Sequence, residues 1–245
     1  MNSIFFFKLL FSLMCSGKST FLYQFLQNLD KVTNIGEMAE QLEVYFFYSS
    51  RSSTQQLENM AKCSKHIISF HMKYGCPTEQ FLTELRNVPN QSKIQKFLIF
   101  EDLSHYIQNM GKHYLTNLCN LVLESRHIKL SLLNIIHNVP FTLNNDRINF
   151  DKILFQNATL LVLFCTVNNC HEVKRVVQKV LPDRFKDFVD MIYFSTKMCK
   201  LDEKDQFSPR PYIAINLDPS QNLSFDTISR CATDIFGRQI TFRTG

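Results

Sequence analysis

The chain has 245 residues, 45% of them hydrophobic and 20% charged, so it can bury a sizeable core like an ordinary globular protein. The formal net charge of +5 mildly favours an anionic partner, but it falls short of the basic arm or patch that would prove nucleic-acid binding. The 8 cysteines include no C-x-x-C pair and no cluster with zinc spacing, which excludes the common zinc modules and indicates a reducing compartment.

The chain begins with an apolar run at 4–11 that a single charge, Lys8, interrupts. A signal peptide is the alternative interpretation of this segment, but its charge should precede the apolar run, and cleavage near Cys15 would cut the loop described below. We therefore expect an intracellular protein that is not secreted. No later run approaches the roughly 18 to 20 apolar residues of a membrane-spanning helix, so we expect no membrane partner.

Strands and helices alternate along the rest of the sequence. The run at 4–11 has the continuity of a strand covered on both faces. Further strands are predicted at 43–48, 66–70, 97–100, 130–136, 160–165 and 212–217. Helical spacing or capping predicts helices at 19–29, 55–62, 79–86, 114–125, 171–180 and 184–193, with a turn at 74–77 before the third of them.

This alternation predicts an α/β protein with a mostly parallel central sheet and helices on both faces. We expect one domain over 1–218 and a C-terminal tail or hairpin extension over 219–245. Ligands of such sheets bind at the carboxyl ends of the strands, and three polar clusters lie there in the predicted order: 16–20, 101–102 and 137–138.

The first cluster has the form of a phosphate-binding loop between a strand and a helix. Its glycine allows close backbone approach, Lys18 suits the β- and γ-phosphates, and the Ser19 hydroxyl suits Mg²⁺. Ser12 stands where the full G-x-x-x-x-G-K-[ST] pattern has its first glycine. The predicted ATP-binding residues are Ser12, Cys15, Ser16, Gly17, Lys18, Ser19 and Thr20.

The second and third clusters supply candidate catalytic groups. Two adjacent carboxylates at a strand end need a cation nearby, and Mg²⁺–nucleotide provides one. We assign Glu101 to Mg²⁺ together with Ser19, and Asp102 to the base that activates water, although the two carboxylates can exchange roles. His137 and Asn138 are placed to sense the γ-phosphate, with a simple turn before Pro140 as the alternative.

A positive charge in the transition state often comes from an arginine of a neighbouring subunit. Arg126 and Arg147 are the candidates by position, and we place Arg147 in the site.

The order of these motifs resembles the genome-packaging ATPases of large and mid-sized double-stranded DNA viruses, of the poxvirus type, and of virus-like transposons. These enzymes belong to the FtsK/HerA class. Besides the phosphate loop and the strand that ends in Glu101 and Asp102, the similar segments are 45–57, 74–78, 126–138, 147–164 and 212–218. This chain has His137 where the family usually has glutamine, and no arginine in 166–171 where the family usually has one.

The resemblance implies an ATP- and Mg²⁺-dependent motor that pumps double-stranded DNA, independently of sequence, into a capsid through its portal vertex. It also implies a homo-oligomeric ring at the virus assembly site, in the cytoplasm or nucleus of a host cell. Two alternatives remain open: a catalytically impaired nucleotide-binding remnant of such an ATPase, and a different P-loop enzyme such as a small nucleotide kinase.

Overall fold

A computed structural model describes residues 7–11, 22, 25–26, 41–49, 67–87, 94–125, 127–128, 130–136, 150–158, 160–164, 170–180, 182 and 212–216. The predicted helices at 55–62 and 184–193 and the expected C-terminal extension over 219–245 lie outside these residues. Of the predicted helix at 19–29, three residues are described, Leu22, Phe25 and Leu26, and all three are helical.

Seven strands form one sheet in the order β3-β2-β4-β5-β1-β6-β7. Every neighbouring pair is parallel except β6 and β7, which are antiparallel. The strands are β1 (Phe7–Phe11), β2 (Gln41–Tyr48), β3 (Ile67–Tyr74), β4 (Ile94–Glu101), β5 (Leu130–Ile136), β6 (Leu160–Phe164) and β7 (Tyr212–Asn216). The predicted α/β class with a mostly parallel sheet is therefore confirmed.

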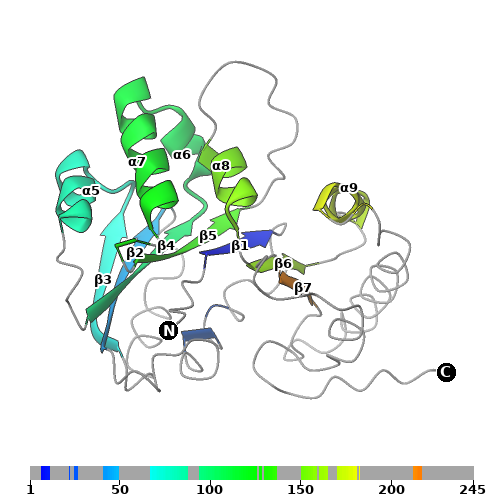
Figure 1. Ribbon diagram of the computed structural model, residues 1–245, viewed down its shortest axis with the longest axis horizontal. Helices are drawn as coiled ribbons and strands as arrows, with labels where there is room; N and C mark the ends of the chain where they lie inside the picture. The colour runs from blue at the N-terminus through cyan, green and yellow to red at the C-terminus, as the bar shows by residue number, and fades with distance from the viewer. Residues whose placement is uncertain are drawn as a thin grey trace.

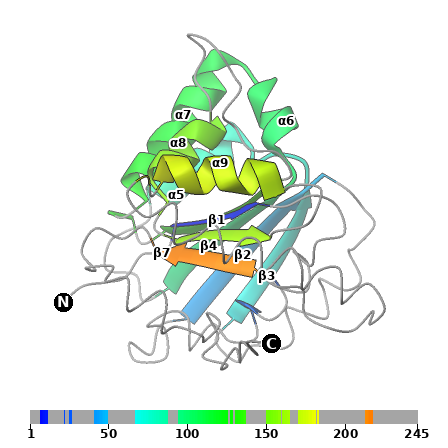
Figure 2. The same ribbon diagram turned by 90° about the vertical axis from the view of Figure 1, so that its right-hand side faces the viewer.

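Five described helices connect the later strands: α5 (Glu79–Arg86), α6 (Ser104–Gln108), α7 (Lys112–Glu124), α8 (Phe150–Gln156) and α9 (Cys170–Val180). Three helical residues, Leu22, Phe25 and Leu26, follow β1. In Figures 1 and 2 the five labelled helices all lie on one side of the sheet.

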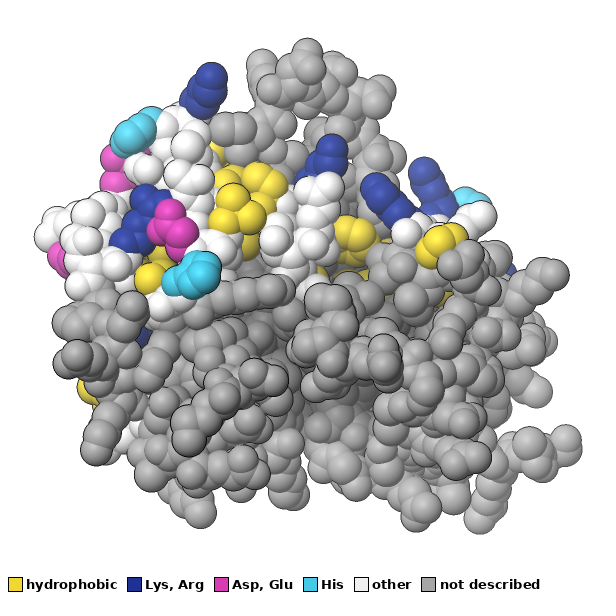
Figure 3. All heavy atoms as spheres, viewed as in Figure 1, with side chains coloured by type: hydrophobic (Ala, Val, Ile, Leu, Met, Phe, Trp, Pro, Cys, Tyr) yellow, Lys and Arg dark blue, Asp and Glu magenta, His cyan; other side chains and the backbone are white. Residues whose placement is uncertain are grey.

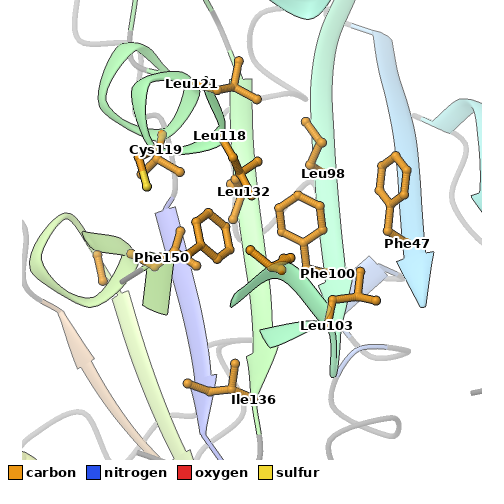
Figure 4. Close-up of a cluster of buried hydrophobic side chains, with 14 of the residues drawn as sticks. Phe47, Leu98, Phe100, Leu103, Leu118, Cys119, Leu121, Leu132, Ile136 and Phe150 are labelled. Carbon is orange, nitrogen blue, oxygen red and sulfur yellow. The ribbon is translucent and has the colours of Figure 1, made fainter. Parts of the chain in front are cut away.

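Each face of the sheet has its own buried cluster. The first cluster joins the labelled helices to one face, and Figure 4 shows its centre, where Phe100 and Phe150 lie beneath Leu118 and Cys119 of α7. The second cluster, on the opposite face, joins Leu22, Phe25 and Leu26 to alternate residues of the strands. The prediction of helices on both faces is thus confirmed, because alternate side chains of one strand point to opposite faces.

The strand order follows from the handedness of the crossovers. The chain passes from β1 toward the β3 edge by way of the second face, where Leu22 and Phe25 lie. The later connections, through α5, α6 with α7, and α8, run back in the opposite direction over the first face. Right-handed crossovers require opposite directions to use opposite faces. The connection that leaves β1 and the connections that leave its sheet neighbours β5 and β6 thus lie on opposite faces, which makes the carboxyl end of β1 a topological switch point of the sheet.

The structure corrects three details of the sequence prediction. Strand β3 continues to Tyr74, four positions beyond its predicted end at residue 70, because an edge strand tolerates exposed polar residues such as His71 and Lys73. Helix α6 was not predicted, since it is five residues long and buries one apolar side chain, Ile107. Helix α8 was also not predicted, although Phe150 and Leu154 have the helical i, i+4 spacing that could have found it.

Candidate functional site

The acidic pair lies where the sequence predicts, at the carboxyl end of a central strand. Glu101 is the last residue of β4 and is partly buried, and the exposed Asp102 follows it. The backbone amide of Asp102 donates a hydrogen bond to the carbonyl oxygen of Ile135 at 2.9 Å. The point at which the chain leaves β4 is therefore held against β5.

Asp102 has a backbone φ of 55°, in the left-handed region. Among the residues that the structure describes, no other non-glycine residue has a positive φ. Aspartate adopts this conformation more readily than most residues, but left-handed backbone still costs about 1 to 2 kcal/mol. Strained backbone that the surrounding structure maintains is common at functional sites. The strain at Asp102 therefore favours a functional reason for an acidic residue at this position.

Glu101 lies on the second face of the sheet. The alternate residues Phe97 and Ile99 belong to the second buried cluster, so the alternation of the strand places Glu101 on the same face. The rings of Phe25 and Phe97 stack with centroids 5.8 Å apart. The carboxylate of Glu101 is thus on the face that carries the helical residues that follow the G-K-S-T sequence.

The end of β1 lies at the same level of the sheet as this acidic pair. Phe11 pairs with Ile136 of β5, and Glu101 pairs with Ile135 of the same strand. One strand separates β1 from β4, so their backbones are about 10 Å apart, which is two strand spacings. Strands β1 and β5 end just before Ser12 and His137, and β4 ends at Glu101. These three strand ends meet at one edge of the sheet, as predicted.

The other predicted site residues lie outside the described residues: Ser12, Cys15, Ser16, Gly17, Lys18, Ser19, Thr20, Arg126, His137, Asn138 and Arg147. Their roles, and the distance between the Lys18 amine and the two carboxylates, stay predictions.

The donors at this edge suit magnesium. Mg²⁺ in nucleotide sites takes one or two protein carboxylates and completes its octahedral shell with phosphate oxygens and water. Glu101 and Asp102 are oxygen donors of this kind, and β1, which the G-K-S-T sequence follows, lies two strands away from β4 in the sheet. Among the described residues, no group of three or more His, Cys, Asp or Glu side chains is close enough to hold a metal ion alone.

A second polar cluster lies toward the amino ends of β2, β3 and β4, away from this edge. The Ser69 hydroxyl donates to the Glu43 carboxylate at 3.3 Å, and Glu43 also lies 3.6 Å from His71 Nε2 and 3.9 Å from Lys96 Nζ. Burial, and to a smaller extent the neighbouring carboxylate of Glu43, raises the pKa of the Tyr45 hydroxyl to about 12. The Lys96 ammonium balances the Glu43 carboxylate, so we interpret the cluster as structural.

The helices on the first face carry charges of both signs. Figure 3 shows Lys, Arg, Asp, Glu and His side chains intermixed over α5 and α7, with apolar side chains between them. Arg86 Nε of α5, for example, lies 3.0 Å from a carboxylate oxygen of Glu124 of α7. Within the described residues of this view, the surface does not form a continuous basic patch of the kind that binds nucleic acid.

Two residues near the site, Asn134 and Tyr48, were not predicted from the sequence. Asn134 is a fully buried amide inside the apolar strand β5, paired with Leu9 on one side and Phe100 on the other. A polar amide inside the apolar run at 130–136 was the sequence signal that could have identified Asn134. Tyr48 ends β2 and pairs with Glu101. Nothing in the sequence relates those two positions, because strand order decides which strand lies beside β4.

The sheet, with a G-K-S-T sequence after β1 and an acidic pair at the end of β4, has the α/β fold of P-loop proteins. No protein-family model and no curated protein matches the sequence. Solved structures do show similarity. The genome packaging NTPase B204 of Sulfolobus turreted icosahedral virus 2, in complex with ATP-gammaS, is 12% identical with a TM-score of 0.44. The alignment covers 90% of this chain and 96% of that one.

Two further structures are similar over part of the chain. EssC (ATPases 2 and 3) from Geobacillus thermodenitrificans is 11% identical with a TM-score of 0.46, and the match covers 66% of this chain and 32% of that one. The KaiC-like protein PH0186 from Pyrococcus horikoshii OT3 is 14% identical with a TM-score of 0.39. That match covers 64% of this chain and 69% of the other. The motifs resemble viral genome-packaging ATPases, and a viral genome packaging NTPase is among the similar structures.

Among the described residues, no helix is both long and apolar enough to span a membrane.

Proposed function

We propose that this chain is a P-loop ATPase that couples ATP hydrolysis to the translocation of double-stranded DNA during viral genome packaging. One observation carries the ATPase proposal: the phosphate-loop sequence follows β1, the switch strand, and Glu101 lies at the same sheet edge. DNA translocation, the capsid or portal partner, the homo-oligomeric ring and the virus assembly site rest on the resemblance of the motifs.

The packing of Phe25 supports this arrangement. Phe25 contacts Phe97, which is four residues before Glu101, or about 13 Å along the strand. The helical residues that follow the G-K-S-T sequence therefore pack against the strand that ends in Glu101, on the face of the sheet that carries this residue.

Each site residue has a proposed role. Lys18 holds the β- and γ-phosphates, and the backbone amides of Ser16, Gly17 and Thr20 surround them, with Ser12 and Cys15 completing the loop. Ser19 and Glu101 hold Mg²⁺, which when bound neutralises charge that develops on the phosphate oxygens.

Hydrolysis then needs an oriented water. Asp102 accepts the proton of this water as its oxygen bonds to the γ-phosphorus and the bond to the bridging oxygen of ADP breaks. His137 and Asn138 sense the loss of the γ-phosphate. Arg147 of a neighbouring subunit, or Arg126, supplies positive charge in the transition state.

The test is ATP hydrolysis by the full chain, with and without duplex DNA, alongside Lys18→Ala and the matched control Lys112→Ala, an exposed lysine on α7. We expect DNA-stimulated hydrolysis in the native chain and in Lys112→Ala, and none in Lys18→Ala. Hydrolysis that survives Lys18→Ala would overturn the site.

Two other outcomes would identify the alternatives. Nucleotide binding without hydrolysis, even with DNA present, would indicate an impaired remnant, which the serine at position 12 would explain. Transfer of the γ-phosphate to a nucleoside monophosphate would indicate a small nucleotide kinase.

A further inference from the structure

Two tyrosines and Glu101 form a row of paired residues across three neighbouring strands. Tyr48 pairs with Glu101 of β4 on one side and with Tyr74 of β3 on the other. Tyr48 packs against the second buried cluster, so it lies on the face that carries Glu101. Three neighbouring strands therefore end in the order Tyr74, Tyr48, Glu101 at the carboxyl edge.

The backbone and ring of Tyr48 are held from several directions. Its carbonyl oxygen accepts a hydrogen bond at 2.9 Å from the amide of Gly75, whose φ of +85° makes the turn after β3. Its ring centroid lies 5.7 Å from that of Tyr74, with the planes at 77°, and 6.0 Å from that of Phe46. Tyr74 itself is 58% exposed, so the row runs from solvent to the acidic residue.

Glu101 consequently has a defined neighbour on each side. Side chains at paired positions of adjacent parallel strands are separated by about 4.8 Å, the spacing of the strands. Tyr48 occupies one side of Glu101, and Ile135, which is buried, occupies the other. A side chain between two bulky neighbours has fewer accessible rotamers.

We propose that Tyr48 is a positioning residue that restricts the Glu101 carboxylate to the orientation in which it meets Mg²⁺–ATP. This inference rests on the proposed ATPase function. The ring provides the restriction, so phenylalanine should replace tyrosine and alanine should not. Misplacement of a catalytic carboxylate lowers turnover more than ground-state binding, since orientation matters most in the transition state.

The kinetic test compares Tyr48→Ala and Tyr48→Phe with Tyr45→Ala. Tyr45 is a matched control because it is also a partly buried tyrosine of β2, on the opposite face and packed against the first cluster. We expect Tyr48→Ala to lower kcat for ATP by about tenfold to a hundredfold, with KM changed less than threefold or so. Tyr48→Phe should retain kcat, and Tyr45→Ala should lose stability without this loss of kcat.

A second measurement does not depend on turnover. The chain has 8 tyrosines and no tryptophan, so labelling with 3-fluorotyrosine gives a small set of fluorine NMR signals. Tyr48→Phe assigns the signal of Tyr48 by its loss. Addition of Mg²⁺ and ATPγS should shift the Tyr48 signal and leave that of Tyr45 in place, and Glu101→Gln should reduce the shift.

The outcomes separate the two proposals. If Mg²⁺–ATP does not bind, the ATPase proposal fails and this inference fails with it. If nucleotide binds but the Tyr48 signal stays in place, or Tyr48→Ala retains the native kcat, the positioning role alone is overturned. If Tyr45→Ala loses kcat as severely as Tyr48→Ala, the loss reflects general destabilisation of β2, which also overturns it.

Discussion

The ring of Phe25 stacks on the ring of Phe97 with 5.8 Å between centroids, which joins the helical residues that follow the phosphate-loop sequence to the strand that ends in the acidic pair. Both rings are buried in the second cluster. This contact joins two parts of the proposed nucleotide site through the core.

Shortening Phe25 should therefore weaken both stability and the site. We expect Phe25→Ala to lower the free energy of unfolding by about 3 to 5 kcal/mol, since it leaves a cavity in a fully buried cluster. Phe25→Leu should cost about half as much. Chemical denaturation measures both, and binding of Mg²⁺–ATP by the folded Phe25→Leu variant reports on the site. A loss below about 1 kcal/mol for Phe25→Ala would contradict the packing described for this helix.

The two carboxylates of the acidic pair should differ in their effects. Glu101→Gln should weaken Mg²⁺-dependent nucleotide binding, because an amide is a poorer magnesium ligand than a carboxylate. Asp102→Asn should leave binding intact and lower kcat by about 10²- to 10⁴-fold, the usual contribution of a general base. Asparagine also tolerates the left-handed backbone at this position. Titration calorimetry and steady-state kinetics separate the two effects, and the reverse pattern would exchange the assigned roles.

The hydroxyl of Tyr114 donates a buried hydrogen bond at 2.8 Å to the carbonyl oxygen of Pro77, which links α7 to the turn before α5. Tyr114→Phe leaves that carbonyl without its donor, so unfolding should become easier by about 1 to 3 kcal/mol. Tyr106→Phe is the control, because Tyr106 is 50% exposed and water can replace any bond that its hydroxyl makes. Equal stabilities of the two variants in urea would indicate that the Tyr114 bond contributes nothing.

Alkaline pH should destabilise the protein through its buried thiol and phenol groups. Burial raises the pKa of the Cys119 thiol from 9.0 to about 11, and burial with Glu43 raises that of Tyr45 from 10.0 to about 12. The unfolded chain loses these protons at lower pH than the folded chain. The contribution of these two groups to stability is therefore constant below about pH 9, and it falls as pH rises from the unfolded pKa to the folded pKa of each group.

The measurement is the free energy of unfolding at several pH values between 8 and 11. Cys119→Ala removes the thiol, so its stability should fall less steeply than that of the native chain between about pH 9 and 11, by roughly 1 to 3 kcal/mol over the interval. The slope is compared because the substitution itself lowers stability at every pH. Parallel curves for the two proteins would show that Cys119 does not contribute.

The elements whose signal is local could be predicted from the amino-acid pattern alone. Strand β5 occupies the residues predicted for it, 130–136, because a strand covered on both faces is a continuous apolar run. Helix α5 begins after Thr78 as predicted, and the Thr78 hydroxyl accepts from the amide of Phe81 at 3.2 Å. The position of Glu101 and Asp102 at a strand end also followed from the sequence, because an apolar run stopped at two charges.

The tertiary structure decided what depends on contacts between distant segments. The extent of β3 and the existence of α6 depended on which surfaces the sheet leaves exposed, since their own residues carry weak periodicity. The order of the strands decided that β5 lies between β1 and β4 and that Tyr48 stands beside Glu101. Hydrophobic patterning specifies which residues are buried but not which strand becomes a neighbour, because apolar attraction has no direction. The handedness of the crossovers then limits the arrangements available and brings the polar strand ends to one edge.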